Sequence, residues 1–225
     1  MERGKLIVAV KDNLRPLGFT DGDGNLQGLE IDIARKLAEE LLGDANAVEF
    51  RPTSNQERLN VLLEGEVDLV IANLTATESR DRFVNFSRYY YLNHTAFATK
   101  DPNLNTLGDL ATRKIALLEG SSTIAVVRYH LPQATLVGVQ SYQEAQTLLE
   151  TGAADAFAAD VPVLTGWVQE APQYRLLRDR LPGEALCVAM PKGLAYSNLY
   201  LRVNQLLSRW QISGWLPERI TYWGL

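Results

Sequence analysis

The stretch VDLVIANLTATESR, residues 67–80, joins an apolar strand to a polar loop and an arginine. An arginine holds a carboxylate through two parallel, charge-assisted hydrogen bonds. The pattern therefore predicts an anion site near Thr75, Thr77 and Arg80. The same letters also fit a helix cap, because Thr75-x-x-Glu78 is a capping-box pattern. In that second interpretation a threonine caps the following helix and the arginine lies in solvent.

Length and composition are typical of an ordinary globular protein. The 225 residues are 46% hydrophobic and 22% charged, which suits one large domain or two lobes. The formal net charge of −5 comes from interspersed acidic and basic residues, so a surface for nucleic acid or an anionic membrane is disfavoured. Any anion site must therefore be local.

Cysteine and histidine are too scarce for a zinc site or an internal disulfide. Cys187 is the single cysteine, and His94 and His130 are the only histidines. The chain has no apolar run near the ~20 residues of a membrane helix, and no basic segment followed by an apolar one at its start. We expect a soluble chain whose export signal has been removed, or a domain excised from a larger protein.

Strands and helices alternate along both halves of the chain. Apolar runs predict strands, and helical spacing of apolar residues predicts helices that end at a glycine. In the first half we expect strands at 5–10, 47–52 and 67–72, and helices up to Gly43 and at 56–64. In the second half we expect strands at 114–118, 134–139 and 154–160, and helices at 123–131 and from Ser141. This order predicts two α/β units with mostly parallel sheets, which bind ligands beyond the carboxyl ends of their strands.

The remaining segments predict how the two units are joined. Residues 96–100 and 184–193 are expected to form strands that link the halves, and residues 198–212 a long amphipathic helix. The simplest topology returns that helix to the first unit. Lobe 1 is then discontinuous, residues 1–95 and 188–225, and lobe 2 is residues 96–187, with two hinge strands between them.

At this point the chain resembles the solute-binding proteins of family 3, which serve ABC importers of polar amino acids and have the type II periplasmic-binding-protein fold. The resemblance rests on the order and spacing of several motifs: RPLGFTDGDGNLQGLEIDIARKLAEEL, residues 15–41; LNVLLEGEVDLVIANLTATESRDRFVNFSRYYY, residues 59–91; LGDLATRKIALLEGSS, residues 107–122; GAADAFAAD, residues 152–160; and MPKG, residues 190–193. It implies a monomer in the periplasm or outside the cell, which needs no cofactor and hands an amino acid to a membrane permease.

The resemblance also implies one clamp for the amino-acid head group. Arg80 stands where the family's arginine grips the α-carboxylate, with Thr75 beside it. The turn containing Ser121 and Ser122 is expected to offer backbone N–H groups at a helix N-terminus. Asp160 matches the aspartate that accepts the α-ammonium group, with help expected from the carbonyl of Asn73. The residues alone are equally consistent with a helix cap at residue 160, two positions before a proline.

Specificity is expected to depend on positions that differ among relatives. Lys11 stands where relatives that bind cationic or amide side chains place an acidic residue, and Arg58 matches an arginine of the glutamate/aspartate subgroup. Two cations near the ligand's side chain favour glutamate or aspartate. Alternatively both cations are solvated, or Arg58 pairs with Glu57 or Glu64 on its own helix. Asn55, where relatives carry an aromatic residue, keeps glutamine and asparagine as competitors.

Two other kinds of protein share this fold in the same resemblance. One is an enzyme similar to the cyclohexadienyl dehydratases, in which Glu119 or Asp160 would act as the acid. The cations near the side chain and the missing aromatic residues argue against an enzyme. The other is the ligand-sensing ectodomain of a receptor, whose binding chemistry would be the same.

Overall fold

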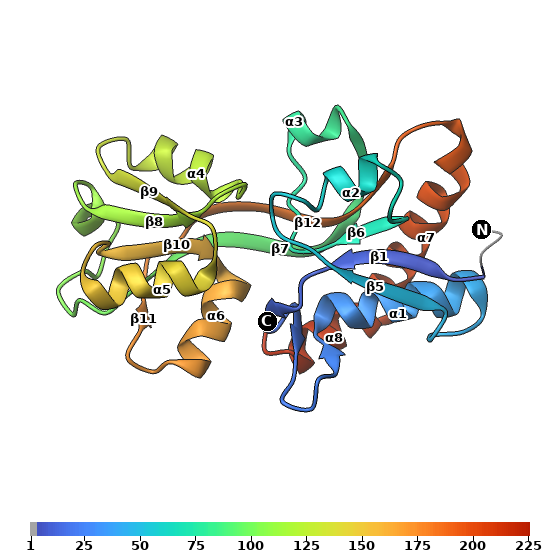
Figure 1. Cartoon of the computed structure of the whole chain (residues 1–225), viewed down its shortest axis with the longest axis horizontal. Helices are drawn as coiled ribbons and strands as arrows, with labels where there is room; N and C mark the ends of the chain where they lie inside the picture. Colours follow the sequence, from blue (N-terminus) through green and yellow to red (C-terminus); the bar gives the residue numbers. More distant parts are fainter. Residues whose placement is uncertain (1–3) are drawn as a thin grey trace. The chain divides into compact units, whose positions relative to one another are not determined.

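The computed structural model describes residues 4–225 and divides them between two units. Unit 1 is Met1–Leu92 with Ala185–Leu225, and unit 2 is Asn93–Glu184. The predicted boundaries, at 95 and 187, lie three residues further along the chain. Two strands, β7 (Val84–Thr99) and β12 (Leu181–Pro191), carry the chain from one unit into the other, as the colours of Figure 1 show.

Unit 1 is built on a mixed sheet in the order β5-β1-β6-β12. Strand β1 is parallel to both β5 and β6, and β12 is antiparallel to β6. A small antiparallel sheet, β2-β3-β4, follows β1 in sequence. The strands and helices of this unit, besides β7 and β12, are β1 (Leu6–Val10), β2 (Asn13–Leu14), β3 (Gly18–Thr20), β4 (Leu26–Gln27), α1 (Leu29–Leu42), β5 (Val48–Pro52), α2 (Asn60–Leu63), β6 (Leu69–Ile71), α3 (Glu78–Asp81), α7 (Ser197–Ser213) and α8 (Trp215–Tyr222).

Unit 2 repeats the plan with the strand order β7-β10-β8-β9. Strands β10 and β9 are both parallel to β8, whereas β7 is antiparallel to β10. Helices α4 and α5 flank this sheet (Figure 1). Its other elements are the 3₁₀ helix η1 (Gly108–Leu110), β8 (Lys114–Leu118), α4 (Thr123–His130), β9 (Thr135–Val139), α5 (Tyr142–Thr151), β10 (Ala156–Asp160), α6 (Val161–Glu170) and β11 (Arg175–Leu176).

A repeated aspartate fixes the start of the inner parallel strands in each unit. Asp68 Oδ2 accepts the N–H of Ile7 at 2.9 Å, and Asp155 Oδ2 accepts the N–H of Lys114 at 2.8 Å. Each aspartate follows a helix-ending glycine by three residues, and that spacing recurs in the sequence. The recurring glycine-to-aspartate spacing therefore has a structural cause, because each carboxylate accepts a hydrogen bond from a backbone N–H at the end of a pair of strands.

Several predicted elements differ from those observed. The helix expected over 56–64 is reduced to α2, and the residues before it form a turn in which Ser54 and Glu57 cap one another's backbone amides. The linking segments are longer than expected, since β7 spans Val84–Thr99 and β12 spans Leu181–Pro191. The short strands β2, β3 and β4 were not predicted; strands of two or three residues leave too little alternation to detect. No described helix is long and apolar enough to cross a bilayer.

Gly28 lets helix α1 begin directly against the preceding turn. Its φ is +130°, and a Cβ on it would lie 2.2 Å from the carbonyl oxygen of Leu17. That carbonyl accepts the N–H of Glu30 at 2.8 Å, and the carbonyl of Pro16 accepts the N–H of Leu29 at 3.0 Å. The glycine thus allows the N–H groups of Leu29 and Glu30, which have no partner within the helix, to bond the preceding turn. The same close approach places Glu30 in the interior.

We expect Gly28→Ala to lower the free energy of unfolding by at least about 3 kcal/mol, because it adds both backbone strain and a clash with main-chain atoms. Gly43→Ala is the matched control. Gly43 also has a positive φ, +87°, but a Cβ added to it would have no atom of the described residues within 4 Å. It should lose only about 1 kcal/mol. Urea denaturation measures both, and equal losses would show that the close approach at Gly28 is unimportant.

Candidate functional site

The loop after β6 is held by buried charged side chains from elsewhere in unit 1. Nη1 of Arg58 donates to the carbonyl oxygens of Ala72 and Asn73, each at 2.7 Å. The N–H of Asn73 donates to Oε1 of Glu30 at 2.6 Å. Asn73 has a φ of +49°, the left-handed conformation that a non-glycine residue adopts only under constraint. Arg58 and Glu30 supply that constraint, because Arg58 binds the carbonyl and Glu30 binds the N–H of the peptide between Ala72 and Asn73.

These contacts give Arg58 a structural role that differs from both interpretations of its sequence position as a solvated cation or a ligand-binding one. The side chain is 1% exposed, so the interpretation of Arg58 as a solvated cation is wrong. Its hydrogen bonds to the 72–73 carbonyls make it a support of the loop that carries Asn73 and Thr75. The Asn73 carbonyl, which we expected to help bind an ammonium group, already accepts one hydrogen bond from this guanidinium.

Thr75 and Arg80 lie close together, as the loop pattern predicted. Thr75 is 3% exposed, and its carbonyl accepts a hydrogen bond from Nη1 of Arg80 at 2.9 Å. A single antiparallel bridge pairs Thr75 with Leu186. The helix cap is Thr77, whose Oγ1 accepts the N–H of Arg80 at 3.3 Å. Arg80 is half-buried rather than fully solvated, so the capping interpretation is correct for Thr77 only.

Lys11 follows directly after β1 and is buried, with 4% exposed. Its Nζ donates to the carbonyl oxygen of Thr53 at 2.9 Å. Burial, followed by the charge of Arg58, lowers the pKa of Lys11 from 10.5 to about 8. An ammonium group has three N–H donors, and the bond to Thr53 uses one of them. The interpretation of Lys11 as a solvated cation is therefore wrong.

Glu30 is the residue that sequence reasoning missed. It is fully buried in the first turn of α1, and Oε1 accepts hydrogen bonds from the Tyr90 hydroxyl at 2.5 Å and from the Asn73 N–H. Burial raises the pKa of Glu30, while the bonds from Tyr90 and Asn73 and the charges of Arg58 and Lys11 oppose that rise. A signal was available. Glu30 occupies the same helical stripe as Ala34 and Leu37, which are buried, so an acidic residue there indicates an internal partner.

Asn55 lies half-buried in the turn between β5 and α2. Within residues 4–225, no donor reaches its buried Oδ1. A buried amide oxygen without a partner is costly, so the side chain is suited to a polar ligand or water. Because β1, β5 and β6 are parallel, Lys11, Asn55 and Asn73 all follow strand ends at the same edge of the unit 1 sheet.

Unit 2 presents a second group of predicted residues at its own strand ends. Asp160 ends β10, is 7% exposed, and occupies the N-cap position of α6 without a side-chain cap bond. Ser121 and Ser122 follow β8, which is parallel to β10, so all three lie at one edge of the sheet. The expected anion-binding turn needs a correction. The N–H of Ser121 donates to the carbonyl of Leu118 at 3.2 Å, so that amide is already used.

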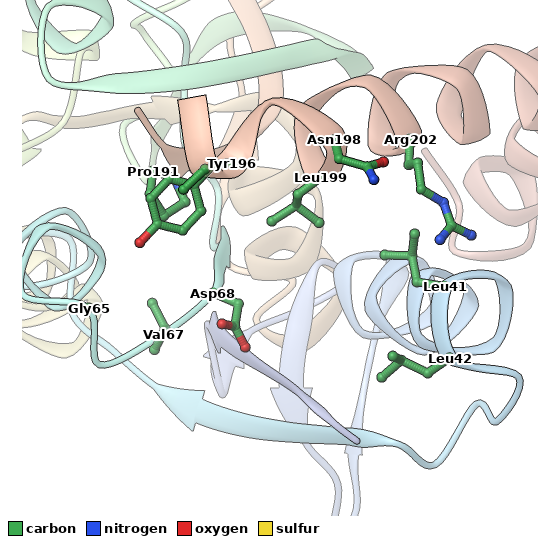
Figure 2. A pocket seen from close by; sticks show the side chains of 11 residues that line it. Leu41, Leu42, Gly65, Val67, Asp68, Pro191, Tyr196, Asn198, Leu199 and Arg202 are labelled. Atoms are coloured by element: carbon green, nitrogen blue, oxygen red, sulfur yellow. The ribbon is translucent and has the colours of Figure 1, made fainter. Parts of the chain in front are cut away.

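A hollow of about 770 Å³ lies elsewhere on unit 1 (Figure 2). It is lined by the end of α1, the turn before β6 and the start of α7, and Figure 2 shows Leu42, Leu199 and the Asp68 carboxylate beside it. Asp68 immediately precedes β6, whereas Asn73 follows it, so the hollow is at the amino end of that strand. No residue predicted for ligand binding lines the hollow, and Asp68 already binds the Ile7 amide.

Comparison with known proteins identifies the family of the chain. The model of the bacterial extracellular solute-binding proteins, family 3, matches residues 6–225. The chain belongs to this family. Its fold is accordingly the type II periplasmic-binding-protein fold, as the sequence predicted. Within residues 4–225 no group of three or more histidine, cysteine, aspartate or glutamate side chains is placed to hold a metal ion.

Relatives within the family carry different ligand names. The glutamine-binding protein of Geobacillus stearothermophilus is 33% identical over 85% of this chain and 74% of its own length. The glutamate-binding protein GluB of Corynebacterium efficiens is 28% identical over 82% of this chain and 65% of its own length. The solved structure of an ancestral arginine-binding protein bound to glutamine is 29% identical, covers 98% of both chains and has a TM-score of 0.88.

The geometry predicts that Arg58 contributes mainly to stability. Arg58→Met should lower the free energy of unfolding by about 3 kcal/mol, because it leaves two buried carbonyls without their donor and removes one of the two cations that act on Glu30. Arg51→Met is the control, since Arg51 makes an exposed ion pair with Glu66 and its loss should change stability by less than about 1 kcal/mol. Chemical denaturation measures both variants. Equal free energies of unfolding for Arg58→Met and Arg51→Met would mean that Arg58 does not support the loop.

Proposed function

We propose that the chain is the extracytoplasmic binding component of an ABC importer for amino acids, and that its ligand is an acidic L-amino acid, glutamate or aspartate. It acts as a monomeric binding protein rather than an enzyme, and it delivers its ligand to a membrane permease. Family membership and the binding proteins among its relatives support the general role. Buried Lys11, with donors remaining beyond its bond to Thr53, supports the acidic ligand.

Each unit contributes part of a clamp for the amino-acid head group in this proposal. In unit 1, the Arg80 guanidinium and Thr75 bind the α-carboxylate. In unit 2, Asp160 accepts the α-ammonium group, and Ser122, at the start of α4, lies beside the carboxylate. A ligand that binds both groups favours the closed state of the protein, because only that state provides all the contacts at once. No step in this mechanism needs a cofactor.

Glutamine is the second candidate ligand, and two observations favour it. The Geobacillus relative is named a glutamine-binding protein, and the ancestral structure contains glutamine. In this chain Oδ1 of Asn55, which has no partner among residues 4–225, suits the amide N–H of glutamine. Lys11 then decides between the two ligands, because an ammonium group gains more from a carboxylate than from a neutral amide.

The head-group clamp is tested by removing one charge from each unit. Arg80→Ala and Asp160→Ala should each weaken binding of L-glutamate by at least about a hundredfold, because each leaves a desolvated ligand charge without its partner. Isothermal titration calorimetry measures the affinity. Small-angle scattering should show the wild type, but neither variant, becoming more compact at a glutamate concentration that saturates only the wild type.

Arg82→Ala serves as the control for these variants, since Arg82 is exposed and follows the same short helix. It should bind glutamate as the wild type does. Wild-type affinity in a folded Arg80→Ala protein would rule out the clamp. Identical scattering profiles of the wild type with and without ligand would rule out closure.

The acidic preference is tested through the protonation of Lys11. L-glutamate should bind at least about ten times more tightly than L-glutamine at pH 7, where Lys11 carries its proton. Because the lowered pKa of Lys11 is about 8, the ammonium charge is lost as the pH rises through that value. The advantage of glutamate over glutamine should then shrink about tenfold between pH 7 and pH 9. Both ligands carry an α-amino group that titrates near the top of this range, so most of that effect cancels in their ratio and the remainder reports Lys11.

Lys11→Met should remove both the preference and its pH dependence. It should also remove a pH dependence of stability. Because the folded pKa lies below the unfolded value of 10.5, the unfolded chain binds more protons between those values, and the wild type gains stability as the pH rises from 8 to 10.5. A wild type that prefers glutamine at pH 7 would overturn the acidic assignment. A preference that is constant from pH 7 to 9 would show that Lys11 does not sense the ligand.

A further inference from the structure

A cluster of titratable side chains is buried in unit 1 behind the loop that carries Thr75. Glu30 comes from α1, Tyr90 from β7, Lys11 from the end of β1, and Arg58 from the turn before α2. None is more than 4% exposed. Burial of this many charged groups is costly unless they are paired with one another. The cluster therefore acts as an electrostatic unit, and the role proposed for Lys11 above uses only one of its members.

Glu30 is the acidic centre of the cluster. Its Oε1 accepts from both the Tyr90 hydroxyl, at 2.5 Å, and the Asn73 N–H, at 2.6 Å. Hydrogen bonds donated to a carboxylate, and cations nearby, favour its ionised form. The two cations here are Arg58 and Lys11, and both act on Glu30 electrostatically. A carboxylate that accepts two hydrogen bonds and feels the charge of two cations is the arrangement expected of a buried counter-ion.

Other ionisable groups also face the cluster. Asp12 and Glu57 act on Lys11, and Cys187, from β12, acts on Tyr90. Cys187 and Tyr90 are both neutral near pH 7, because burial raises the pKa of Cys187 to about 12 and raises that of Tyr90 well above its ordinary value. Glu57 lies at the surface, where solvent screens its charge. Asp12 acts on Lys11 more strongly than Glu30 does, but it is only half-buried. Glu30 is the fully buried acid beside Lys11 and Arg58 among the described residues; burial raises its pKa, and the two cations and the two hydrogen bonds oppose that rise.

We propose that Glu30 is a positioning residue that sets the ligand's charge preference: its carboxylate offsets one of the two buried cations, Lys11 and Arg58, and so reduces the preference of the site for an acidic over a neutral side chain. This inference rests on the proposed amino-acid site, but not on which amino acid wins. With Glu30 ionised, the three side chains carry a net charge of one cation. With Glu30 neutral they carry two, and a ligand carboxylate gains correspondingly more.

A purely structural role of Glu30 would have a different consequence. The bond to the Asn73 N–H holds the loop of the head-group clamp, and every amino acid uses the same head group. Loss of that bond would weaken glutamate and glutamine equally. A change in charge alters only the interaction with the side chain, so the ratio of the two affinities separates the two roles.

The test compares Glu30→Gln with Tyr90→Phe. Glu30→Gln keeps an oxygen that can accept the Asn73 and Tyr90 hydrogen bonds but removes the negative charge. Tyr90→Phe removes one of the same hydrogen bonds but keeps every charged side chain of the cluster. Affinities for L-glutamate and L-glutamine are measured by isothermal titration calorimetry at pH 7. Glu30→Gln should shift their ratio towards glutamate by about tenfold, a typical effect of one nearby charge, and Tyr90→Phe should leave the ratio unchanged.

If Glu30→Gln does not fold, Glu30→Met replaces it, because a buried ionic side chain can often be exchanged for an apolar one of similar volume. The same shift towards glutamate is expected. An unchanged ratio, or an equal loss for both ligands, overturns the proposal for Glu30. A wild type that prefers glutamine overturns the acidic assignment alone, since the variant must still shift the ratio. A wild type that binds neither amino acid overturns both proposals.

Discussion

The peptide that joins Ala72 to Asn73 is the point on which the loop after β6 depends. A parallel strand leaves its last carbonyls without partners, and here the Arg58 guanidinium donates to two of them while Glu30 accepts the next amide N–H. The resulting left-handed turn at Asn73 directs the chain into Thr75 and Arg80. Arg58 and Glu30, two buried charged side chains from other segments, thus determine the conformation of a loop whose own residues 72 and 73 are uncharged. The same pair sets the electrostatic background at this edge of the unit 1 sheet.

That background explains why ligand identity is harder to infer than fold. In the proposed function Lys11 favours an acidic ligand, and in the further proposal Glu30 reduces that preference by offsetting one of the two buried cations. Relatives named for glutamine and for glutamate are 33% and 28% identical to this chain, respectively. A percentage identity does not show whether two chains differ by one charge in a buried cluster. Such a difference is nevertheless enough to change which side chain a site prefers.

The sequence was sufficient where regular spacing or a local capping rule determines structure. The apolar run and glycine stop of α1, the strand β8 and the capping serine at 141 are formed as predicted. The two α/β units followed from the order of such elements, and the type II fold, confirmed by family membership, followed from the resemblance to the family. The sequence was insufficient where structure depends on distant partners. Nothing near Arg58 in the sequence shows that it binds carbonyls 14 and 15 residues away. One local bond was also missed, because the N–H of Ser121 closes a turn on the carbonyl of Leu118.

The discontinuous course of unit 1 has a consequence for how the chain is made. Strand β6 pairs with β12, and α7 packs on α1, yet β12 and α7 lie beyond residue 180. A ribosome that has released only the first hundred residues has therefore exposed an apolar sheet edge whose covering strand does not yet exist. Unit 2, by contrast, is encoded without interruption between residues 93 and 184. The later-encoded unit is thus the first that can be completed during synthesis, and the nascent first half must be kept from aggregating until the C-terminal segment emerges.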